Sequence, residues 1–263
     1  MIDAAEQVAP DGTIRTGARR DRVPAVFEDV LRDAVAAVGD PGASLYLYGS
    51  VATGSARPGS SDVDLLSIDL PDAATTGRRL SARYADRYRG VEIAAATTAE
   101  LTGDTDAAHG LRVFLRHYCV HLTGPDPAAA LPAYRADARA ARGLNGDLDH
   151  HLQKWRSASS SATEPADRLG VRVARKTLLA VAGLVSVHDH TWTTDRSRAA
   201  RRWSEIEPAL AGELTSLHRW ASGDQAPSHQ ETQGALDADG IVATVVERFS
   251  DLIGLWPDGP ANR

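Results

Sequence analysis

The sequence predicts an α/β (α+β) fold over its first half and an all-helical domain over its second half. Two short apolar runs, at residues 45–48 and 63–70, are joined by a glycine-rich turn, which is typical of consecutive β-strands. A third run, at residues 91–96, indicates a third strand. The intervening segments carry apolar residues at helical spacing, so we expect a small mixed sheet flanked by helices.

Length and charge limit the class of protein. With 263 residues, 43% of them hydrophobic, the chain can bury one large core or two small ones. The formal net charge is −6 and no basic block occurs, which disfavours nucleic acid as a partner and suits a cationic ligand better.

The compartment is predicted from three further features. No apolar run approaches the length of about 18 residues that spans a membrane. Cys119 is a single cysteine and cannot form an internal disulfide, and the N-terminus carries Asp3 and Glu6 without an apolar leader. We therefore expect a cytoplasmic protein without a membrane partner.

The chain is expected to begin with a flexible arm over residues 1–22, which are polar and rich in glycine and arginine. From Pro24 the apolar residues recur at helical spacing, which predicts a helix that ends at Gly39. A second helix is expected over residues 73–88, after the second strand, and Gly90 ends it.

The second predicted strand opens with two carboxylates, Asp62 and Asp64. Side chains on a strand alternate, so both carboxylates lie on one face, roughly 6.5 Å apart along the chain, which is close enough to share metal ions. Val63 points the other way, into the core. Such a pair is often only a solvated strand end, but here it follows Gly49-Ser50, and a turn with free backbone N–H groups can hold phosphate oxygens.

The third predicted strand carries an acid, Glu92, between Val91 and Ile93, where a buried strand does not normally place one. Two interpretations are open. Glu92 is either an edge-strand acid that faces water or a third carboxylate beside Asp62 and Asp64 on the neighbouring strand.

The chain from residue 126 onwards is predicted to be helical, with the domain boundary after residue 125 in a Thr-Gly-Pro-Asp-Pro break. Apolar spacing predicts helices at residues 133–155, 169–187 and 239–256, and a solvated loop of small polar residues at 157–163.

The combined motif consists of an apolar residue, Gly49-Ser50, about eleven further residues and Asp62-Val-Asp64-Leu. It resembles the signature of the nucleotidyltransferase superfamily, whose small-molecule members include the aminoglycoside adenylyltransferases for streptomycin and spectinomycin. The domains that this resemblance implies are a nucleotidyltransferase domain at 23–125 and a helical domain at 126–263.

The resemblance also implies roles for individual residues. Asp62 and Asp64 would hold two Mg²⁺ ions that bridge the triphosphate of ATP. The phosphate-binding residues would be Gly49, Ser50 and Ser61. Glu92 matches the family's third acid, which in the antibiotic adenylyltransferases is the general base for the acceptor hydroxyl, and it is a base, a metal ligand or both.

Positive charge for the triphosphate is expected from the helical domain. In the family a basic residue shortly before Ala-Ala supplies it, and Arg196 stands at the matching position, where arginine replaces the usual lysine. Lys176 on the preceding helix is the second such residue. For both side chains, a solvated helix flank is the alternative interpretation.

Two departures from the family concern the acceptor. Residues 97–109 are short and polar and lack the aromatic residue that packs on the drug in the streptomycin and spectinomycin enzymes. Residues 171–176 are apolar and basic, where those enzymes carry an acid for the cationic drug. Glu164 and Asp167 lie just upstream and would take that role in a shifted register.

These observations predict an enzyme that moves an NMP group, AMP from ATP, to a hydroxyl of a small molecule and releases pyrophosphate. The expected partners are an NTP and a hydroxylated small-molecule acceptor, without nucleic acid, in a monomer or dimer. One alternative is an aminoglycoside adenylyltransferase that confers antibiotic resistance. A second is an antitoxin-like enzyme that adenylylates a protein, against which the second domain argues, and a third is a binding module, against which the three acids argue.

Overall fold

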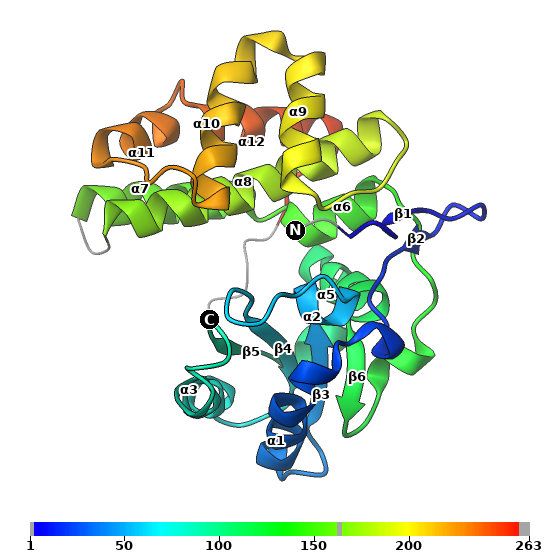
Figure 1. Cartoon of the computed structure of the whole chain (residues 1–263). Coiled ribbons are helices and arrows are strands. Elements are labelled where there is room, and N and C mark those ends of the chain that lie inside the picture. Colours follow the sequence, from blue (N-terminus) through cyan, green and yellow to red (C-terminus); the bar gives the residue numbers. More distant parts are fainter. Residues whose placement is uncertain (1–2, 162–164, 258–263) are drawn as a thin grey trace. The chain divides into compact units, whose positions relative to one another are not determined.

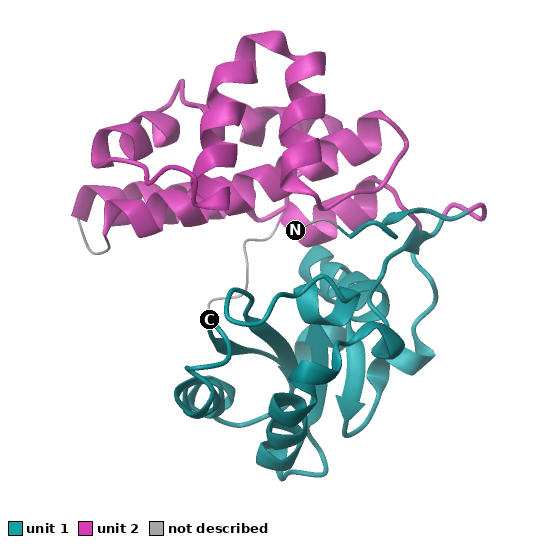
Figure 2. Ribbon diagram, viewed as in Figure 1, with its two compact units in different colours: residues 1–9, 13–134 teal, residues 10–12, 135–263 magenta. Residues whose placement is uncertain are grey.

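The computed structural model describes residues 3–161 and 165–257. The chain forms two compact units, the first made of Met1–Ala9 and Thr13–Tyr134 and the second of Pro10–Gly12 and Arg135–Arg263 (Figure 2). The first unit extends beyond the boundary expected at residue 125, because the N–H of Ile14 donates to the carbonyl of Tyr134 at 2.8 Å. The N–H of Tyr134 in turn donates to Nε2 of His117 at 2.8 Å.

The first unit contains a four-stranded sheet with the spatial order β5–β4–β3–β6 (Figure 1). The strands are β3 (Ser44–Tyr48), β4 (Val63–Ile68), β5 (Val91–Ala96) and β6 (Val120–Thr123). β3 is antiparallel to both β4 and β6, whereas β4 and β5 are parallel. The prediction of a small mixed sheet is therefore confirmed.

Helices cover both faces of this sheet, and alternate strand residues enter two apolar clusters. Leu47 of β3 and Val63 of β4 are fully buried in the cluster that also contains residues of α1 and α3. Tyr46 and Leu66 belong to the opposite cluster, with Leu115 of α5. The helices are α1 (Glu28–Val38), α2 (Gly49–Thr53), α3 (Ala73–Arg83), α4 (Thr98–Thr102) and α5 (Asp106–Tyr118).

Residues 7–22 include regular elements where a loose arm was expected. β1 (Gln7–Val8) pairs antiparallel with β2 (Ile14–Arg15), and 3₁₀ turns follow at η1 (Arg20–Arg22) and η2 (Ala25–Phe27). The segment is held by long-range contacts: the N–H of Arg19 donates to the carbonyl of Ala52 at 3.0 Å, and the hydroxyl of Tyr118 donates to Glu6 at 2.8 Å. Such contacts leave no periodic pattern in a short polar sequence.

Helix α3 ends at Arg83, five residues before the expected end at residue 88. The two tyrosines that follow are buried in an irregular segment instead. The Tyr84 hydroxyl donates to Asp33 and the Tyr88 hydroxyl to the carbonyl of Val26, each at 2.6 Å. These two hydrogen bonds satisfy buried phenols, and a continued helix would turn the side chains away from their acceptors.

In the second unit the regular elements among residues 135–161 and 165–257 are helices, as predicted. Helix α8 is central, because it packs against all the other α-helices of this unit (Figure 1). The elements are α6 (Ala138–Asn145), α7 (Leu148–Ser161), α8 (Ala166–His188), α9 (Arg196–Ile206), η4 (Pro208–Leu210), α10 (Ala211–Ser222), α11 (His229–Leu236) and α12 (Ile241–Leu252). A short η3 (Pro127–Ala130) precedes them in the first unit.

The serine-rich run at residues 157–161 continues α7, where a solvated loop was expected. Its hydroxyls donate to carbonyls one turn earlier, Ser157 to Gln153 at 3.1 Å and Ser161 to Ser157 at 2.7 Å. The hydroxyls thereby satisfy their hydrogen-bonding capacity within the helix, a possibility that serine composition does not reveal. The remainder of the expected loop, residues 162–163, lies outside the described residues.

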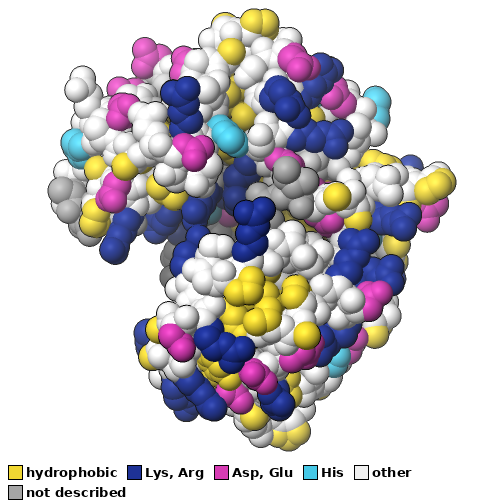
Figure 3. Space-filling model, viewed as in Figure 1, with side chains coloured by type: hydrophobic (Ala, Val, Ile, Leu, Met, Phe, Trp, Pro, Cys, Tyr) yellow, Lys and Arg dark blue, Asp and Glu magenta, His cyan; other side chains and the backbone are white. Residues whose placement is uncertain are grey.

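The described helices include none that is long and apolar enough to cross a membrane. On the face of the molecule in Figure 3, acidic side chains lie among basic ones over both units. This surface is consistent with the absence of a basic block from the sequence.

Candidate active site

Three side chains of the first unit stand in one row across the sheet. In the strand register Tyr48 of β3 is opposite Asp64 of β4, and Asp64 is beside Glu92 of β5. Side chains at paired positions point to the same face, so the three lie on the side of the sheet that α5 covers. The register therefore agrees with the interpretation that places Glu92 beside the acidic pair.

Asp64 is an acid in a strongly negative environment. Burial raises the pKa of its carboxyl to about 6, and the charges of Asp62 and Glu92 add to this shift, while Arg89 opposes it. A carboxylate that is partly desolvated and close to two like charges is stabilised by any cation that approaches. This negative environment is the electrostatic feature that a divalent-cation site requires.

The carboxylate of Asp62 is turned toward Arg89. Nε of Arg89 donates to Oδ1 of Asp62 at 2.9 Å, and its Nη2 donates to Oδ2 in a second, short hydrogen bond. Among residues 3–161 and 165–257, no three His, Cys, Asp or Glu side chains are gathered closely enough to hold a metal ion. The structure thus brings the three predicted acids into one neighbourhood without converging their oxygens on one point.

Gly49 is required at its position for two reasons. Its backbone is left-handed, with φ of +70°, and a Cβ built on it would collide with the carboxylate of Asp64. Only glycine combines this conformation with so close an approach. The turn that opens α2 is therefore held directly against the acid row, as the Gly49-Ser50 motif predicted, and Ser50 itself is buried.

Ser61 lies in the loop that leads into β4. Its Oγ accepts a hydrogen bond from the N–H of Arg57 at 2.9 Å, and its carbonyl accepts one from the N–H of Arg89 at 3.3 Å. The hydroxyl holds the loop and retains its own proton for one further hydrogen bond.

Lys176 and Arg196 belong to the second unit, on α8 and at the start of α9. Nζ of Lys176 lies 2.7 Å from Oδ1 of Asp147, and this pair is only about one fifth exposed. Burial disfavours the charge of Asp147, yet hydrogen bonds from His151 and Lys176 and their charges hold the pKa of that carboxyl at about 2. Lys176 therefore already has a partner of opposite charge.

Arg196 has a different environment. Its Nε donates to the carbonyl of Arg175 at 3.2 Å, and burial, together with the positive charge of Arg175, lowers the pKa of its guanidinium. The preceding residue, Asp195, caps α9 by accepting hydrogen bonds from the N–H groups of Ser197 and Arg198. The charge of Asp195 opposes this lowering of the pKa, and the phosphate-binding role of Arg196 stays a prediction.

Sequence reasoning missed two residues of this neighbourhood, Tyr48 and Arg89. Burial raises the pKa of the Tyr48 phenol, and the charges of Asp64 and Glu92 raise it further. The Tyr48 ring also contacts Phe114 of α5 edge-on, with 5.1 Å between ring centroids. The position of Tyr48 directly before Gly49 and that of Arg89 two residues before the third strand were the available signals.

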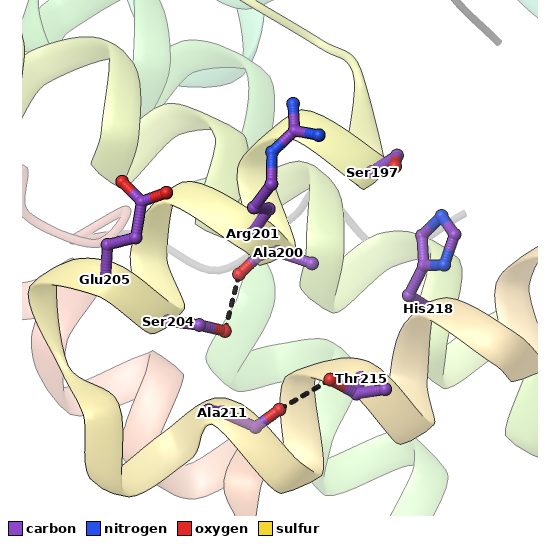
Figure 4. A pocket seen from close by; sticks show the side chains of 8 residues that line it. All are labelled: Ser197, Ala200, Arg201, Ser204, Glu205, Ala211, Thr215 and His218. Atoms are coloured by element: carbon purple, nitrogen blue, oxygen red, sulfur yellow. Dashed lines mark hydrogen bonds between the residues drawn. The ribbon is translucent and has the colours of Figure 1, made fainter.

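A separate hollow of about 400 Å³ lies between α9 and α10 of the second unit (Figure 4). It is lined by Ser197, Ala200, Arg201, Ser204, Glu205, Ala211, Thr215 and His218. The Ser204 and Thr215 hydroxyls donate to carbonyls of their own helices, each at 2.7 Å. Its lining contains none of the predicted site residues and a single carboxylate, so we do not assign the chemistry to it.

Comparison with known proteins supports the assignment of the first unit. A family model described as a nucleotidyltransferase domain matches residues 29–98, a segment that contains Gly49, the Asp62–Asp64 pair and Glu92. No curated protein sequence matches the chain.

Among solved structures, the chain is similar to the spectinomycin adenyltransferase AAD(9) from Enterococcus faecialis, solved with ATP and spectinomycin. The TM-score is 0.50 at 11% sequence identity, over 88% of this chain and 97% of that one. At this identity the likeness is one of fold. The chain therefore carries a nucleotidyltransferase domain, is an enzyme of the nucleotidyl-transferring class, and resembles the aminoglycoside adenylyltransferases in fold.

Proposed function

We propose that the protein transfers AMP from ATP to a hydroxyl group of a small molecule, in a Mg²⁺-dependent reaction that releases pyrophosphate. The observation that carries this proposal is the register of β4 and β5, which sets Glu92 beside Asp64 within the matched domain. Asp64 itself lies two residues after Asp62 on the chain. Three carboxylates in this arrangement suit a reaction in which a hydroxyl loses its proton beside a metal-bound phosphate.

The donor set fits Mg²⁺. The ion prefers carboxylate and other oxygen ligands, and the pKa of Asp64 is raised first by burial and then by the neighbouring charges of Asp62 and Glu92, all of which a bound cation would offset. Asp62 and Asp64 would hold the metal, with Glu92 as a further ligand or neighbour. When bound, Mg²⁺ supplies positive charge that neutralises the triphosphate.

Individual side chains of the protein would transfer the proton and bind the phosphate groups. Glu92 accepts the proton of the acceptor hydroxyl, the hydroxyl oxygen forms a bond to the α-phosphorus, and the bond from that phosphorus to the pyrophosphate oxygen breaks. Gly49 leaves room for the carboxylate of Asp64 directly beside the turn, and the hydroxyls of Ser50 and Ser61 donate to phosphate oxygens. In the second unit, Arg196 remains the expected source of positive charge for the triphosphate, because Lys176 is already paired with Asp147.

An aminoglycoside adenylyltransferase is the second candidate, because the similar solved structure is a spectinomycin adenyltransferase with ATP and spectinomycin. ATP as the nucleotide is proposed on the same ground. The antitoxin-like alternative is disfavoured, since the similarity extends over 88% of the chain and so includes the helical unit.

The test is a transfer assay with Mg²⁺ and each NTP labelled at the α-phosphate, with and without a panel of hydroxylated acceptors. We expect label from ATP to move to a small molecule, pyrophosphate to appear in equal amount, and chelation of the metal to stop both.

Asp64→Asn should abolish this transfer, because it removes a metal ligand from a strand end without changing the shape of the side chain. The matched control is Asp72→Asn, which changes an exposed acid beyond the other end of β4. Label on protein, no transfer at all, or full activity of Asp64→Asn would contradict the proposal.

A further inference from the structure

Arg89 is placed where it competes with a metal ion for Asp62. Its guanidinium donates to both carboxylate oxygens of Asp62, one of the bonds measuring 2.9 Å. The same charge also interacts with Asp64 and Glu92. Arg89 is therefore the counter-charge of the whole acid row in the protein without a metal.

The guanidinium of Arg89 can move away from Asp62 while the backbone of Arg89 stays in place. The side chain of Arg89 is 57% exposed, so its release into water costs little desolvation, whereas that of Asp62 is only 19% exposed. The backbone of Arg89 is tied to the loop before β4, because its N–H donates to the carbonyl of Ser61 at 3.3 Å. Gly90, the next residue, lies under the Asp62 carboxylate, where a Cβ would be 3.4 Å from Oδ1.

The guanidinium of Arg89 and a metal ion cannot both bind the carboxylate of Asp62. A divalent cation takes an oxygen of Asp62, and it repels a guanidinium that is bound to the same group. A displaced guanidinium next to metal-bound phosphate has an alternative partner of suitable shape, since its planar fork matches phosphate oxygens as well as carboxylate oxygens.

We propose that Arg89 is a displaceable counter-ion, which binds Asp62 in the metal-free protein and exchanges it for a phosphate group of the nucleotide when the metal enters. This inference rests on the proposed function. It assigns to Arg89 two partners in succession, and each is tested by a binding measurement that does not depend on turnover.

The first measurement is a Mn²⁺ titration followed by electron paramagnetic resonance, in the absence of nucleotide. Arg89→Gln should bind Mn²⁺ more tightly than the unmodified protein, by on the order of tenfold, because the competitor for Asp62 is gone. Arg83→Gln is the matched control: Arg83 is also an exposed arginine of the first unit with a carboxylate partner, Asp33, at 2.9 Å. Arg83→Gln should leave the affinity for Mn²⁺ unchanged.

The second measurement is calorimetric binding of α,β-methylene-ATP in the presence of saturating Mn²⁺, since this analogue cannot release pyrophosphate. Arg89→Gln should bind the analogue several-fold more weakly, because the phosphate loses its guanidinium partner. Arg89→Lys, which keeps the charge but lacks the fork, should fall between Arg89→Gln and the unmodified protein in both measurements.

The two arms separate exchange from a purely structural role. If Arg89 only orients Asp62, Arg89→Gln binds Mn²⁺ more weakly, which overturns the proposal. Unchanged affinity for Mn²⁺ or for the analogue overturns it as well. In these cases the proposed function stands, provided that Asp64→Asn abolishes Mn²⁺ binding. If no Mn²⁺ binding depends on Asp64, the proposed function fails, and the inference with it.

Discussion

Asp64 has two acids as neighbours, Asp62 two residues earlier in the chain and Glu92 on the adjacent strand β5. The sheet fixes these positions. Its partner positions, Tyr48 and Glu92, are set by backbone hydrogen bonds of β3, β4 and β5, so the side chains cannot separate without disrupting the sheet. The protein therefore stores unfavourable electrostatic energy at this residue, a common property of catalytic sites.

The raised pKa of Asp64 predicts how the free energy of unfolding depends on pH. An ordinary Asp has a pKa of about 3.9, whereas that of folded Asp64 is about 6, so between these values the folded state binds more protons than the unfolded state. By linkage, the free energy of unfolding of the metal-free protein should fall as pH rises from 4 to 7, with a contribution from this residue of no more than about 3 kcal/mol.

Urea unfolding of the metal-free protein across this pH range measures the effect, and Asp64→Asn is the control because it cannot titrate. The difference in stability between the two proteins should change through pH 6. Parallel pH profiles for the protein and Asp64→Asn would show that Asp64 titrates normally.

Glu92 is the proposed base, and its replacement separates binding from chemistry. Glu92→Gln should retain binding of Mn²⁺ and α,β-methylene-ATP while transfer falls by on the order of 10²- to 10⁴-fold, since the amide cannot accept the hydroxyl proton. Calorimetry and the transfer assay measure the two effects independently. An equal loss of metal binding would identify Glu92 as a ligand instead of a base.

At the level of elements, the turn from β3 into α2 positions the acid row. Gly49→Ala should cost about 1 kcal/mol of stability through its positive φ, and it should also displace the Asp64 carboxylate and weaken Mn²⁺ binding. Gly39→Ala is a matched control, because Gly39 has φ of +60° with no atom within 4 Å of a built Cβ.

Unfolding and Mn²⁺ binding of both variants distinguish strain from contact. Both variants should lose similar stability, but only Gly49→Ala should lose metal affinity. Normal Mn²⁺ binding by Gly49→Ala would show that the turn does not position the metal ligands.

In the segment after β5, the secondary structure determines which role Glu100 can take. Residues 97–109, a short polar segment in the sequence, include α4 and the start of α5. Glu100 closes a capping box with Thr97, accepting its N–H at 2.8 Å. This acid is therefore engaged in a helix cap, which makes it a poor ligand for a cationic acceptor.

At the level of the whole molecule, the distribution of charge bears on which acceptor the protein prefers. The helix positions at which related enzymes carry an acid for the drug are occupied here by Arg172, Arg175 and Lys176. Asp167 stands at the start of α8, and Glu164 lies outside the described residues. A like-charge contact at 4 Å costs about 1 kcal/mol in water and more where water is excluded.

Streptomycin and spectinomycin should consequently be poor substrates, and a neutral or anionic hydroxylated metabolite, for example one from secondary metabolism, should be better. Comparison of kcat/KM across such acceptors measures this preference. Many-fold resistance to either drug in a susceptible bacterium, lost with Asp62→Asn, would overturn the prediction. The likeness to a spectinomycin enzyme, at 11% identity, is one of fold.

Local patterns in the chain were sufficient for β3, β4 and β5, for the glycine-serine turn and for placing Asp62 and Asp64 on one face, but not for β1, β2 and β6. These features depend on neighbours within a few residues, through strand alternation and backbone conformation. The position of Glu92 beside them could also be predicted, because it combines one such pattern with a family resemblance.

Other features depend on partners that are distant in the sequence. Arg89 meets Asp62 only because β4 and β5 are parallel and in one particular register, and Lys176 meets Asp147 only because α8 packs beside the start of α7. Glu6 and Arg19 are held in place for the same reason, through contacts with Tyr118 and Ala52. No local propensity encodes a strand register or a helix packing, since both result from burying the apolar surfaces of the whole chain together.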